Sequence, residues 1–254
     1  MSEIPGALSL QGRVAVVTGA GRGIGAATSR LLARAGAHVA LLDRDAAGVT
    51  RTAEAIGVAG GEALPFTNDI TDSFAVERTL DRVVEEWGRL DVLVNNAGEL
   101  REAPLDDLTD DDLEESLDIN LRGTLVCTRA AVPLMMTRGS GRVLSAASMS
   151  TRIGAVGLTA YAASKAAVVG MTRTWARELG PKGLTANAVA PGLIDSETTS
   201  TVPSGELEAT LARLPARRLG QPDEVAAVYL FLASDLASFI NGAVVGVDGG
   251  LALV

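Results

Sequence analysis

The sequence predicts an α/β protein built on a doubly wound parallel sheet of about seven strands, with helices on both faces. Three observations support this prediction. Short apolar segments alternate with segments of helical period along the whole chain, which is the pattern of repeated βαβ units. Hydrophobic residues make up 47% of the 254 residues but aromatic residues only 3%, so Ala, Val, Leu and Ile must fill the core, as in parallel strands covered on both faces. A glycine-rich turn directly follows the first apolar segment.

The first half of the chain contains four expected strands and three expected helices. Each strand is a short apolar run, and each helix is a longer segment with apolar residues at helical spacing. Asp72 stands where it can cap the third helix. Because strand, helix and strand alternate, right-handed crossovers should make the sheet parallel. The strands are expected at 13–18, 38–43, 62–67 and 91–95, and the helices at 24–35, 45–57 and 72–87.

The second half continues the alternation and ends in a strand. A helix is expected at 110–136, a strand at 141–147, a helix at 159–180, a strand at 184–190, a Ser/Thr-rich loop at 195–205, helical stretches up to residue 233 and a last strand at 243–247. No repeat, low-complexity tract or linker interrupts this order. We therefore expect residues 1–254 to form a single domain, with 193–218 as a mobile lid over the substrate.

The charge balance and the hydropathy exclude two classes of partner. The chain has 22 Lys and Arg against 31 Asp and Glu, a formal charge of −9, and its longest basic cluster is Arg217-Arg218. Nucleic-acid binding needs a concentrated basic face, so we expect no nucleic-acid partner. No apolar stretch approaches the ~20 residues that span a bilayer, and residues 1–5 show neither a basic start nor an apolar signal core. We expect a cytoplasmic protein without a membrane partner.

The single cysteine and the single histidine argue against a disulfide and a metal site. Cys127 lies in an apolar helical segment, where a small packed residue is a better interpretation than a reactive thiol. His38 starts an expected strand, which is typical of a surface or edge residue. No His/Cys cluster is available as a set of metal ligands, so we expect no metal.

The turn after the first expected strand has the composition of a phosphate-binding loop. It reads Thr-Gly-Ala-Gly-Arg-Gly-Ile-Gly from residue 18 to residue 25, between a strand and a helix. Glycine lets a pyrophosphate approach the backbone without obstruction by Cβ, and the helix N-terminus offers N–H groups and a positive dipole end. The residues predicted to hold a nucleotide here are Gly19, Gly21, Arg22, Gly23, Ile24 and Gly25.

Four motifs in this order are similar to those of a known family. The glycines at 19, 23 and 25 fit T-G-x-x-x-G-x-G, and Asn95-Asn96-Ala97-Gly98, Tyr161-Ala-Ala-Ser-Lys165 and Pro191-Gly192 follow. Together they cover nearly the whole chain, which resembles the short-chain dehydrogenase/reductase family in its compact branch, where the 3-oxoacyl-[acyl-carrier-protein] reductases belong. The resemblance implies a single-domain Rossmann fold and hydride transfer between a nicotinamide cofactor and a carbonyl or alcohol.

Asp43 favours NAD(H) over NADP(H). It ends the second expected strand, 18 residues after Gly25, where a carboxylate accepts hydrogen bonds from the adenosine ribose hydroxyls and repels a 2′-phosphate. A solvent-facing aspartate at a strand end is the alternative interpretation. Arg22 and Arg44 oppose the preference, because an arginine beside the ribose can bind the 2′-phosphate. We therefore expect NAD(H) to be preferred and NADP(H) to be possible.

The resemblance also implies the rest of the cofactor site. Asp69 and Ile70 would flank the adenine, Asn96, Ala97 and Gly98 would pack against the adenosine, and Pro191, Gly192 and Ile194 would lie at the nicotinamide, with the backbone of Ile194 reaching its carboxamide. The family often has Thr a few residues after Pro-Gly. Here Ser196 can donate the same hydrogen bond, although Asp195 and Thr198 leave that assignment open.

Tyr161 and Lys165 lie four residues apart on an expected helix, so their side chains project from one face. A tyrosine with an ordinary pKa of ~10 is a poor base near neutrality. A nearby ammonium stabilises the phenolate and lowers the tyrosine pKa. Tyr161 could then deprotonate an alcohol, or protonate the alkoxide formed in the reverse reaction. By resemblance, Lys165 would also hydrogen-bond the nicotinamide ribose.

Two further positions complete the catalytic set that the resemblance implies. Ser148 precedes Tyr161 by thirteen residues and follows a strand. It matches the family's serine, whose hydroxyl stabilises the developing charge on the substrate oxygen, and Ser145 and Ser150 are the alternatives. Asn120 falls where the family has an asparagine whose backbone carbonyl binds a water that connects Lys165 to solvent. An asparagine on the exposed side of the helix is the alternative.

The substrate is a small carbonyl or alcohol that the sequence does not specify. Pocket walls are expected from Glu99, Ser150, Arg152 and Leu158. Glu99 and Arg152 would favour a polar substrate, and charged residues at the rim of the pocket are the alternative interpretation. We expect an NAD-linked oxidoreductase of secondary alcohols and ketones. The alternatives are an NADPH-dependent 3-oxoacyl thioester reductase of fatty-acid or polyketide type, and a nicotinamide-binding sensor without turnover.

The resemblance implies a homotetramer, with a dimer as the alternative, and small residues and an apolar tail agree with it. Resembling proteins associate through the helices that correspond to 110–136 and 159–180, and through the C-terminal segment. The second of these helices carries Ala162, Ala163, Ala166 and Ala167, which permit close approach of another helix, and the chain ends in Leu-Ala-Leu-Val. An apolar terminus of this kind is better covered than exposed.

Overall fold

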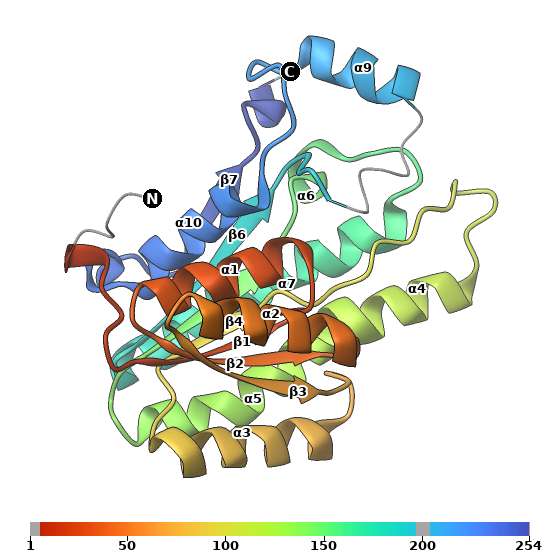
Figure 1. The fold of residues 1–254 in the computed structure, drawn as a ribbon. Coiled ribbons are helices and arrows are strands. Elements are labelled where there is room, and N and C mark those ends of the chain that lie inside the picture. Colours follow the sequence, from red (N-terminus) through yellow and green to blue (C-terminus); the bar gives the residue numbers. More distant parts are fainter. Residues whose placement is uncertain (1–5, 197–203, 254) are drawn as a thin grey trace.

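A seven-stranded parallel sheet forms the centre of the protein, in the strand order β3-β2-β1-β4-β5-β6-β7 (Figure 1). The structure is a computed structural model, and it describes residues 6–196 and 204–253. The strands are β1 (Val14–Thr18), β2 (His38–Asp43), β3 (Glu62–Thr67), β4 (Val92–Asn95), β5 (Gly141–Ala146), β6 (Leu184–Pro191) and β7 (Val244–Val247). The predicted doubly wound fold is therefore confirmed.

Helices cover both faces of the sheet. On one face lie α1, α2 and α10, and on the other lie α3, α5 and α7. The helices are α1 (Gly23–Arg34), α2 (Ala46–Val58), α3 (Ser73–Trp87), α4 (Asp110–Leu117), α5 (Thr124–Met136), α6 (Ser150–Ile153), α7 (Thr159–Leu179), α9 (Ser204–Arg213) and α10 (Pro222–Ala233). Short turns of other helical types are η1 (Gly6–Leu8), η2 (Asp118–Gly123), η3 (Gly180–Lys182), η4 (Asp235–Ala237) and η5 (Leu251–Leu253).

The apolar strand sequences follow from burial on both faces. Every residue of β1 is buried, with Ala15 and Val17 on the side of α1 and α10, and Val14 and Val16 on the side of α3 and α5. Alternate residues of a strand point to opposite faces, so a strand covered on both faces needs apolar residues throughout. Cys127 of α5 is 1% exposed and packs in the core on the side of α3, α5 and α7. Burial raises the pKa of its thiol to about 12. This is the packed residue that the sequence predicts.

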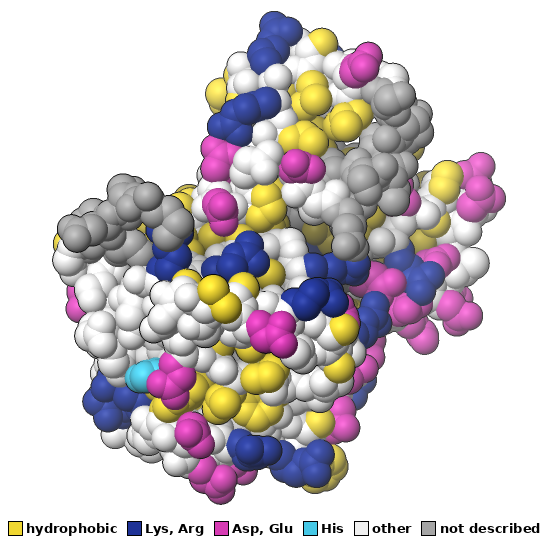
Figure 2. All heavy atoms as spheres, viewed as in Figure 1, with side chains coloured by type: hydrophobic (Ala, Val, Ile, Leu, Met, Phe, Trp, Pro, Cys, Tyr) yellow, Lys and Arg dark blue, Asp and Glu magenta, His cyan; other side chains and the backbone are white. Residues whose placement is uncertain are grey.

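The edge strand β3 carries polar partners instead of a continuous apolar run. Glu62 accepts a hydrogen bond from the indole of Trp87 at 2.8 Å, and its other carboxylate oxygen lies 2.9 Å from Nδ1 of His38. The imidazole of His38 also stacks on Trp87, with ring centroids 5.5 Å apart. His38 begins β2, which is an interior strand, and its side chain is partly exposed, so it is a surface residue, as expected. Figure 2 shows its imidazole at the surface. Charged and polar side chains on an edge strand discourage pairing with another sheet.

The helix predicted over 110–136 is interrupted. It consists of α4, the π-helical turn η2 and α5. Thr109 and Asp112 form a capping box at the start of α4, which fixes where the helix begins. The wider turn η2 places Asn120 toward the interior. A π-turn of this kind often marks a functional position, and its cause is the set of contacts that Asn120 makes with distant residues. The predicted cap of α3 is confirmed, because Asp72 accepts a hydrogen bond from the backbone N–H of Ala75 at 3.0 Å.

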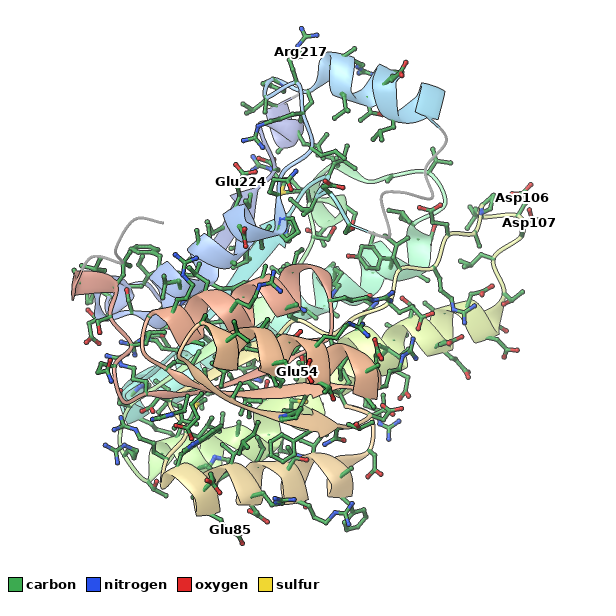
Figure 3. The ribbon with its side chains drawn as sticks, in the orientation of Figure 1. Glu54, Glu85, Asp106, Asp107, Arg217 and Glu224 are labelled. Carbon is green, nitrogen blue, oxygen red and sulfur yellow. The ribbon has the colours of Figure 1, made fainter. Side chains whose placement is uncertain are left out.

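The predicted lid is anchored at both ends. Its first part pairs with residues that precede α10, through a bridge between Ile194 and Gly220. Near its second end, Arg218 makes two hydrogen bonds of 2.7 Å to Glu224. Glu224 lies at the start of α10 (Figure 3). Between these anchors, α9 lies apart from the sheet. Residues 197–203, which include most of the Ser/Thr-rich sequence, lie outside the described residues. Among the helices described, none is long and apolar enough to cross a membrane.

Candidate active site

The predicted site residues gather at the carboxyl ends of the strands. The order in which strands are added changes direction at β1, because β2 and β3 follow on one side of it while β4 pairs with it on the other. The loops after two such strands diverge and leave a crevice, which is where open α/β sheets bind ligands. The glycine turn follows β1 and the Asn96–Gly98 segment follows β4, so these two predicted motifs form the two sides of the crevice.

Hydrogen bonds lock the glycine turn to the segment after β4. Asn96 donates from its side chain to the carbonyls of Thr18 and Gly19, at 3.1 and 3.3 Å. The backbone N–H groups of Asn96 and Ala97 both donate to the hydroxyl of Thr18 at 3.0 Å. This close approach requires glycine. A Cβ on Gly19 would lie 2.8 Å from Cα of Ala97, and a Cβ on Gly25 would lie 1.9 Å from the carbonyl oxygen of Gly19.

The carboxylate of Asp43 faces the glycine turn. One of its oxygens accepts a hydrogen bond of 2.9 Å from the backbone N–H of Gly21, and the other accepts one of 3.0 Å from Asp45. A Cβ on Gly21 would lie 3.0 Å from the first oxygen. The alternative of an aspartate that simply faces solvent is therefore wrong. Each carboxylate oxygen can accept a further hydrogen bond, so Asp43 can still receive ribose hydroxyls.

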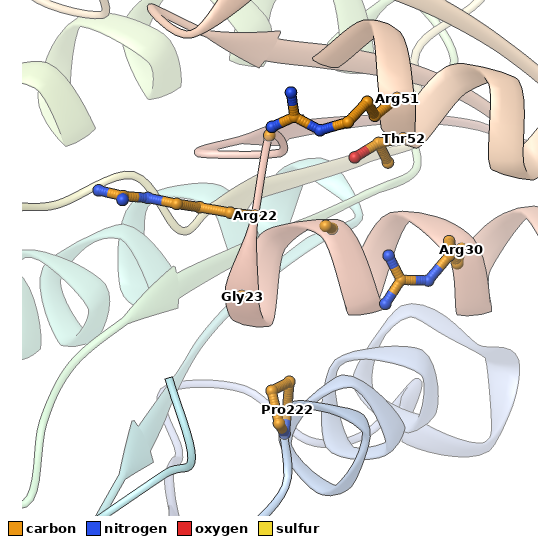
Figure 4. A pocket seen from close by; sticks show the side chains of 8 residues that line it. Arg22, Gly23, Arg30, Arg51, Thr52 and Pro222 are labelled. Carbon is orange, nitrogen blue, oxygen red and sulfur yellow. The ribbon is translucent and has the colours of Figure 1, made fainter. Parts of the chain in front are cut away.

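An open groove that the sequence analysis missed lies beside the glycine turn. Its volume is about 310 Å³, and arginines from α1 and α2 border it (Figure 4). Figure 2 shows basic side chains gathered over this part of the molecule. Arg30 and Arg51 stand 8 and 29 residues beyond Arg22 in the sequence, and that separation gives no signal of a shared surface. The lining residues are Gly21, Arg22, Gly23, Ala26, Arg30, Arg51, Thr52 and Pro222.

Asp69 and Ile70 lie after β3, on the far side of the crevice from Tyr161. Asp69 accepts hydrogen bonds of 2.8 Å from the backbone N–H and from the hydroxyl of Thr71, and the first of these is the main reason that its pKa is lowered. The side chain of Ile70 is 7% exposed and packs on Gly123, where a Cβ would lie 2.4 Å from its Cδ1. The side chain of Ile70 is therefore buried against Gly123, and its backbone is the part that can face the crevice.

Ser148 and Tyr161 meet between β5 and α7. The hydroxyl of Ser148 hydrogen-bonds the phenol of Tyr161. The backbone N–H and the hydroxyl of Ser150 both donate to Oγ of Ser148, at 3.2 and 3.0 Å, which orients that oxygen. Ser145 instead lies within the sheet, where its hydroxyl accepts a hydrogen bond of 3.5 Å from the amide of Asn95. Among the three candidate serines, the structure thus brings Ser148 to Tyr161.

Lys165 lies behind Tyr161 and is almost fully buried. It is 3% exposed, and its ammonium donates a hydrogen bond of 3.0 Å to the carbonyl of Ala146. Its Nζ lies 5.7 Å from the ring centroid of Tyr161. Burial lowers the pKa of Lys165 to about 8. Burial also raises the pKa of Tyr161, and the hydrogen bond from Ser148 offsets part of that rise. In the protein alone, burial therefore outweighs the predicted lowering of the tyrosine pKa.

Asn120 is completely buried, so the alternative of an exposed asparagine is wrong. Its side chain donates to the carbonyl of Glu99 and accepts from the N–H of Glu99, both at 2.9 Å, and it donates to Ser164 at 3.1 Å. Its backbone carbonyl accepts from the hydroxyl of Thr124 at 2.8 Å. A carbonyl oxygen has a second lone pair, so it retains the capacity to bind a water. A Cβ on Gly98 would lie 2.7 Å from the Asn120 amide oxygen.

Comparisons with known proteins identify the family. A sequence profile described as Enoyl-(Acyl carrier protein) reductase matches residues 19–252. The 3-oxoacyl-[acyl-carrier-protein] reductase FabG of Thermotoga maritima is 40% identical over 97% of this chain and 100% of its own length. The chain belongs to the short-chain dehydrogenase/reductase family. Its relatives are NAD(P)-dependent oxidoreductases that act on CH–OH and keto groups, and this protein is an enzyme of that kind.

Two solved structures of short-chain dehydrogenases are also close in shape. A 7α-hydroxysteroid dehydrogenase in complex with NADH and 7-oxo glycochenodeoxycholic acid has a TM-score of 0.93 and 33% identity, with 97% of each chain covered. A putative NAD(P)-dependent gluconate 5-dehydrogenase from Beutenbergia cavernae with bound NADP has a TM-score of 0.92 and 40% identity, over 98% of this chain and 100% of that one. Structures this similar to the present chain have thus been solved with either cofactor.

The segment expected at the nicotinamide is held against β7. Gly192 donates its backbone N–H to the carbonyl of Val247 at 3.0 Å, and a Cβ on Gly192 would lie 2.8 Å from Cα of Asp248. Pro191 accepts a hydrogen bond of 3.0 Å from the N–H of Met149, next to Ser148. This short-chain dehydrogenase therefore carries Pro191, Gly192 and Ile194 into the crevice beside the Ser148 loop. Ser196 is described and Thr198 is not, so the choice between them lies outside the described residues.

The predicted pocket walls lie in two different places. Ser150 contacts Ser148, and Leu158 is half-buried where α7 begins, so these two adjoin the Ser148–Tyr161 pair. Arg152 is exposed on α6. Glu99 was expected near the substrate, but its carboxylate lies 3.5 Å from Arg44, on the adenosine side of the crevice. Nearness to Gly98 in sequence does not fix the direction of this side chain, and a place for Glu99 at the substrate stays a prediction. Val156, which is 96% exposed beside α6, is an apolar residue that the sequence analysis did not single out.

Proposed function

We propose that this protein is an NAD(H)-dependent oxidoreductase of secondary alcohols and ketones, with Tyr161 as its general acid and base. The observation that carries the proposal is the convergence of Ser148, Tyr161 and Lys165 at one end of a crevice whose other end is the glycine turn. The glycine turn fits a dinucleotide, because Gly19 and Gly25 keep the backbone open where any side chain would collide. A bound nicotinamide would supply or accept the hydride.

The proposed roles follow from the hydrogen bonds of the protein. Ser148 would turn its hydroxyl hydrogen, which in the protein alone is donated to Tyr161, toward the substrate oxygen, while Ser150 donates two hydrogen bonds to its Oγ. Tyr161 would take the hydroxyl proton of an alcohol in oxidation and return it to the carbonyl oxygen in reduction. Lys165 would hydrogen-bond the nicotinamide ribose with the donors that Ala146 does not use. The backbone carbonyl of Asn120 would bind the water that links Lys165 to solvent.

The cofactor preference rests on Asp43. Its carboxylate is held at the end of β2 by Gly21 and Asp45, where the resemblance to the family puts the adenosine ribose. A carboxylate there accepts hydrogen bonds from ribose hydroxyls and repels a 2′-phosphate. Asp69 and the backbone of Ile70 would flank the adenine, and Asn96, Ala97 and Gly98 would adjoin the adenosine. Pro191, Gly192, Ile194 and Ser196 would lie at the nicotinamide.

The decisive experiment combines cofactor titration with turnover. NADH and NADPH are titrated separately into wild type and Asp43→Ala by nicotinamide fluorescence, and NADH should bind more tightly in wild type but not in the variant. Turnover is followed as NADH formation over a panel of sugar alcohols, hydroxy acids and hydroxysteroids. Tyr161→Phe should lose about 10²- to 10⁴-fold in kcat and keep NADH binding.

Tyr229→Phe is the matched control for Tyr161→Phe. Tyr229 is fully buried in α10 and its hydroxyl has no hydrogen-bond partner in the described part of the protein, so removing that oxygen should leave kcat nearly unchanged. NADH binding without turnover across the panel would favour the nicotinamide-binding sensor. Equal kcat in Tyr161→Phe and wild type would refute the role of Tyr161.

A second candidate function is an NADPH-dependent 3-oxoacyl thioester reductase. The 40% identity to the 3-oxoacyl-[acyl-carrier-protein] reductase of Thermotoga maritima favours it. Tighter binding of NADPH than of NADH, together with reduction of a 3-oxoacyl thioester, would put this function first. The formal charge of −9 counts against docking of an acidic carrier protein.

We also propose a homotetramer of single-domain subunits in the cytoplasm, with no nucleic-acid or membrane partner. Leu125 and Met136 of α5 are each 40% exposed, and the small residues Ala163, Ala166 and Gly170 lie along the exposed side of α7. Two helices with such surfaces can pack closely against copies of themselves. Light scattering coupled to size-exclusion chromatography would distinguish a tetramer from a dimer.

A further inference from the structure

An ion pair spans the adenosine side of the crevice. Arg44 follows β2 and Glu99 lies in the loop after β4, and Nη2 of Arg44 lies 3.5 Å from Oε2 of Glu99. These strands are not neighbours, because β1 lies between them. Two strand spacings amount to about 10 Å, so the two side chains reach toward each other over the end of β1. The glycine turn, which follows β1, lies between the two residues.

Glu99 is the fixed member of this pair. Its backbone N–H and carbonyl are both hydrogen-bonded to the buried amide of Asn120 at 2.9 Å. Its side chain is 28% exposed, and Oε2 is shielded from solvent without a hydrogen bond of good geometry. Oε1 lies 3.9 Å from Nε of Arg101. The carboxylate is therefore held between two arginines.

Arg44 is the movable member. Its side chain is 71% exposed, whereas Arg101 is also bound to Glu115 and lies 3.6 Å from Asp112 of α4. Arg44 also contributes to lowering the pKa of Asp69, on the other side of the adenine position. Arg44 thus lies among carboxylates, and which of them it faces decides whether its guanidinium can reach the adenosine 2′-position.

We propose that Glu99 is a second residue that selects NAD(H), because it draws Arg44 away from the 2′-position of the adenosine. This inference rests on the NAD(H) preference proposed above and deepens it. A guanidinium N–H that faces a carboxylate does not serve a phosphate at the same time. A 2′-phosphate would meet the carboxylate of Asp43 and would also have to compete with Glu99 for Arg44. The adenosine ribose of NAD(H) carries no 2′-phosphate, so its binding does not require Arg44.

Removing the charge of Glu99 should release Arg44 to the phosphate. In Glu99→Gln the Kd for NADPH should fall about tenfold, which corresponds to one charge-assisted hydrogen bond at a partly exposed site. The Kd for NADH should change less than about twofold, since no phosphate is gained. In the double variant Glu99→Gln with Arg44→Gln, the gain for NADPH should disappear.

Glu102→Gln is the matched control. Glu102 lies in the same loop, is exposed, and has no ion pair in the described part of the protein. Its substitution changes the net charge by the same amount, so it measures the general effect of charge on NADPH binding. That effect should be small, because exposed charges are screened by salt.

The experiment is a fluorescence titration of NADH and NADPH into the three variants and wild type, at one low ionic strength. The inference is supported if Glu99→Gln alone improves NADPH binding and the double variant does not. An unchanged ratio of the two Kd values in Glu99→Gln would overturn it, as would an equal gain in Glu102→Gln. Tighter binding of NADPH than of NADH by wild type would refute the NAD(H) proposal instead, so the two failures are distinguishable.

Discussion

Replacing Lys165 by methionine should make the folded protein more stable near neutral pH, although it removes a side chain that we place in the active site. Lys165 is 3% exposed, and its ammonium donates a hydrogen bond to the carbonyl of Ala146. Burial lowers the pKa of Lys165 from 10.5 to about 8. At pH 7 the folded state therefore holds a charged lysine in surroundings that disfavour the charge.

The size of the effect follows from the pKa of Lys165. One pKa unit corresponds to about 1.4 kcal/mol, so the depression costs the folded state about 3 kcal/mol where both states are protonated. Methionine is apolar and unbranched, and it removes that cost. It also removes the ammonium donor of Ala146, at a cost of about 1 kcal/mol. The variant should be about 2 kcal/mol more stable than wild type at pH 7.

The stabilisation should fade as the pH rises. Between the folded pKa of about 8 and the ordinary value of 10.5, the unfolded state binds more protons than the folded state, so the stability of wild type increases with pH. The advantage of Lys165→Met is therefore full below pH 8 and is lost toward pH 10.5. Burial also raises the pKa values of Cys127 and Tyr161, which lowers stability at high pH. Both proteins contain these groups, so their effect cancels in the difference.

Urea unfolding followed by circular dichroism measures this difference. Wild type and Lys165→Met are compared near pH 7 and again near pH 10, at one protein concentration, because association of subunits also contributes to stability. A variant no more stable than wild type near pH 7 would refute the reasoning about burial. An advantage of the same size at both pH values would show that it does not come from the charge of the lysine.

Two further predictions concern the geometry around this lysine. Gly98→Ala places a Cβ 2.7 Å from the side-chain oxygen of Asn120 and 3.0 Å from Nζ of Lys165. It should lower the free energy of unfolding, measured in urea, by about 1–3 kcal/mol. It should also reduce kcat/KM, measured by steady-state kinetics, at least about tenfold. Ser148→Ala should lower kcat by about 10²- to 10³-fold, while Ser145→Ala, which removes a hydroxyl within the sheet, should leave kcat within about threefold. Similar losses of kcat in both serine variants would contradict the assignment of Ser148.

The strands could be predicted from the sequence because burial on both faces requires uninterrupted apolar runs. Each expected strand is found with its ends shifted by at most one residue, as in the first, expected at 13–18 and found as Val14–Thr18. The interruption of the helix over 110–136 could not be predicted. It depends on the pairing of Asn120 with the backbone of Glu99, which is a contact between distant segments and leaves no local pattern.

The candidate site was predictable where a motif fixes both residue type and spacing. Tyr161 and Lys165 share a helix, and the thirteen-residue spacing to Ser148 distinguishes it from Ser145. Directions of side chains at loop ends were not predictable. The carboxylate of Asp43 is aimed by the N–H of Gly21, and the carboxylate of Glu99 is turned toward Arg44; both orientations depend on segments that only the fold brings together.

The electrostatics of the site favour one direction of proton transfer in the protein alone. Burial raises the pKa of Tyr161 and lowers that of Lys165 to about 8, so both groups are shifted toward their neutral forms. A neutral phenol is the acid that reduction of a ketone requires, whereas oxidation of an alcohol requires the phenolate. Ser148 donates toward that phenolate but offsets only part of the effect of burial. The ammonium of Lys165, 5.7 Å from the ring centroid of Tyr161, is charged at pH 7 and favours the phenolate, and a bound oxidised nicotinamide would add positive charge beside it.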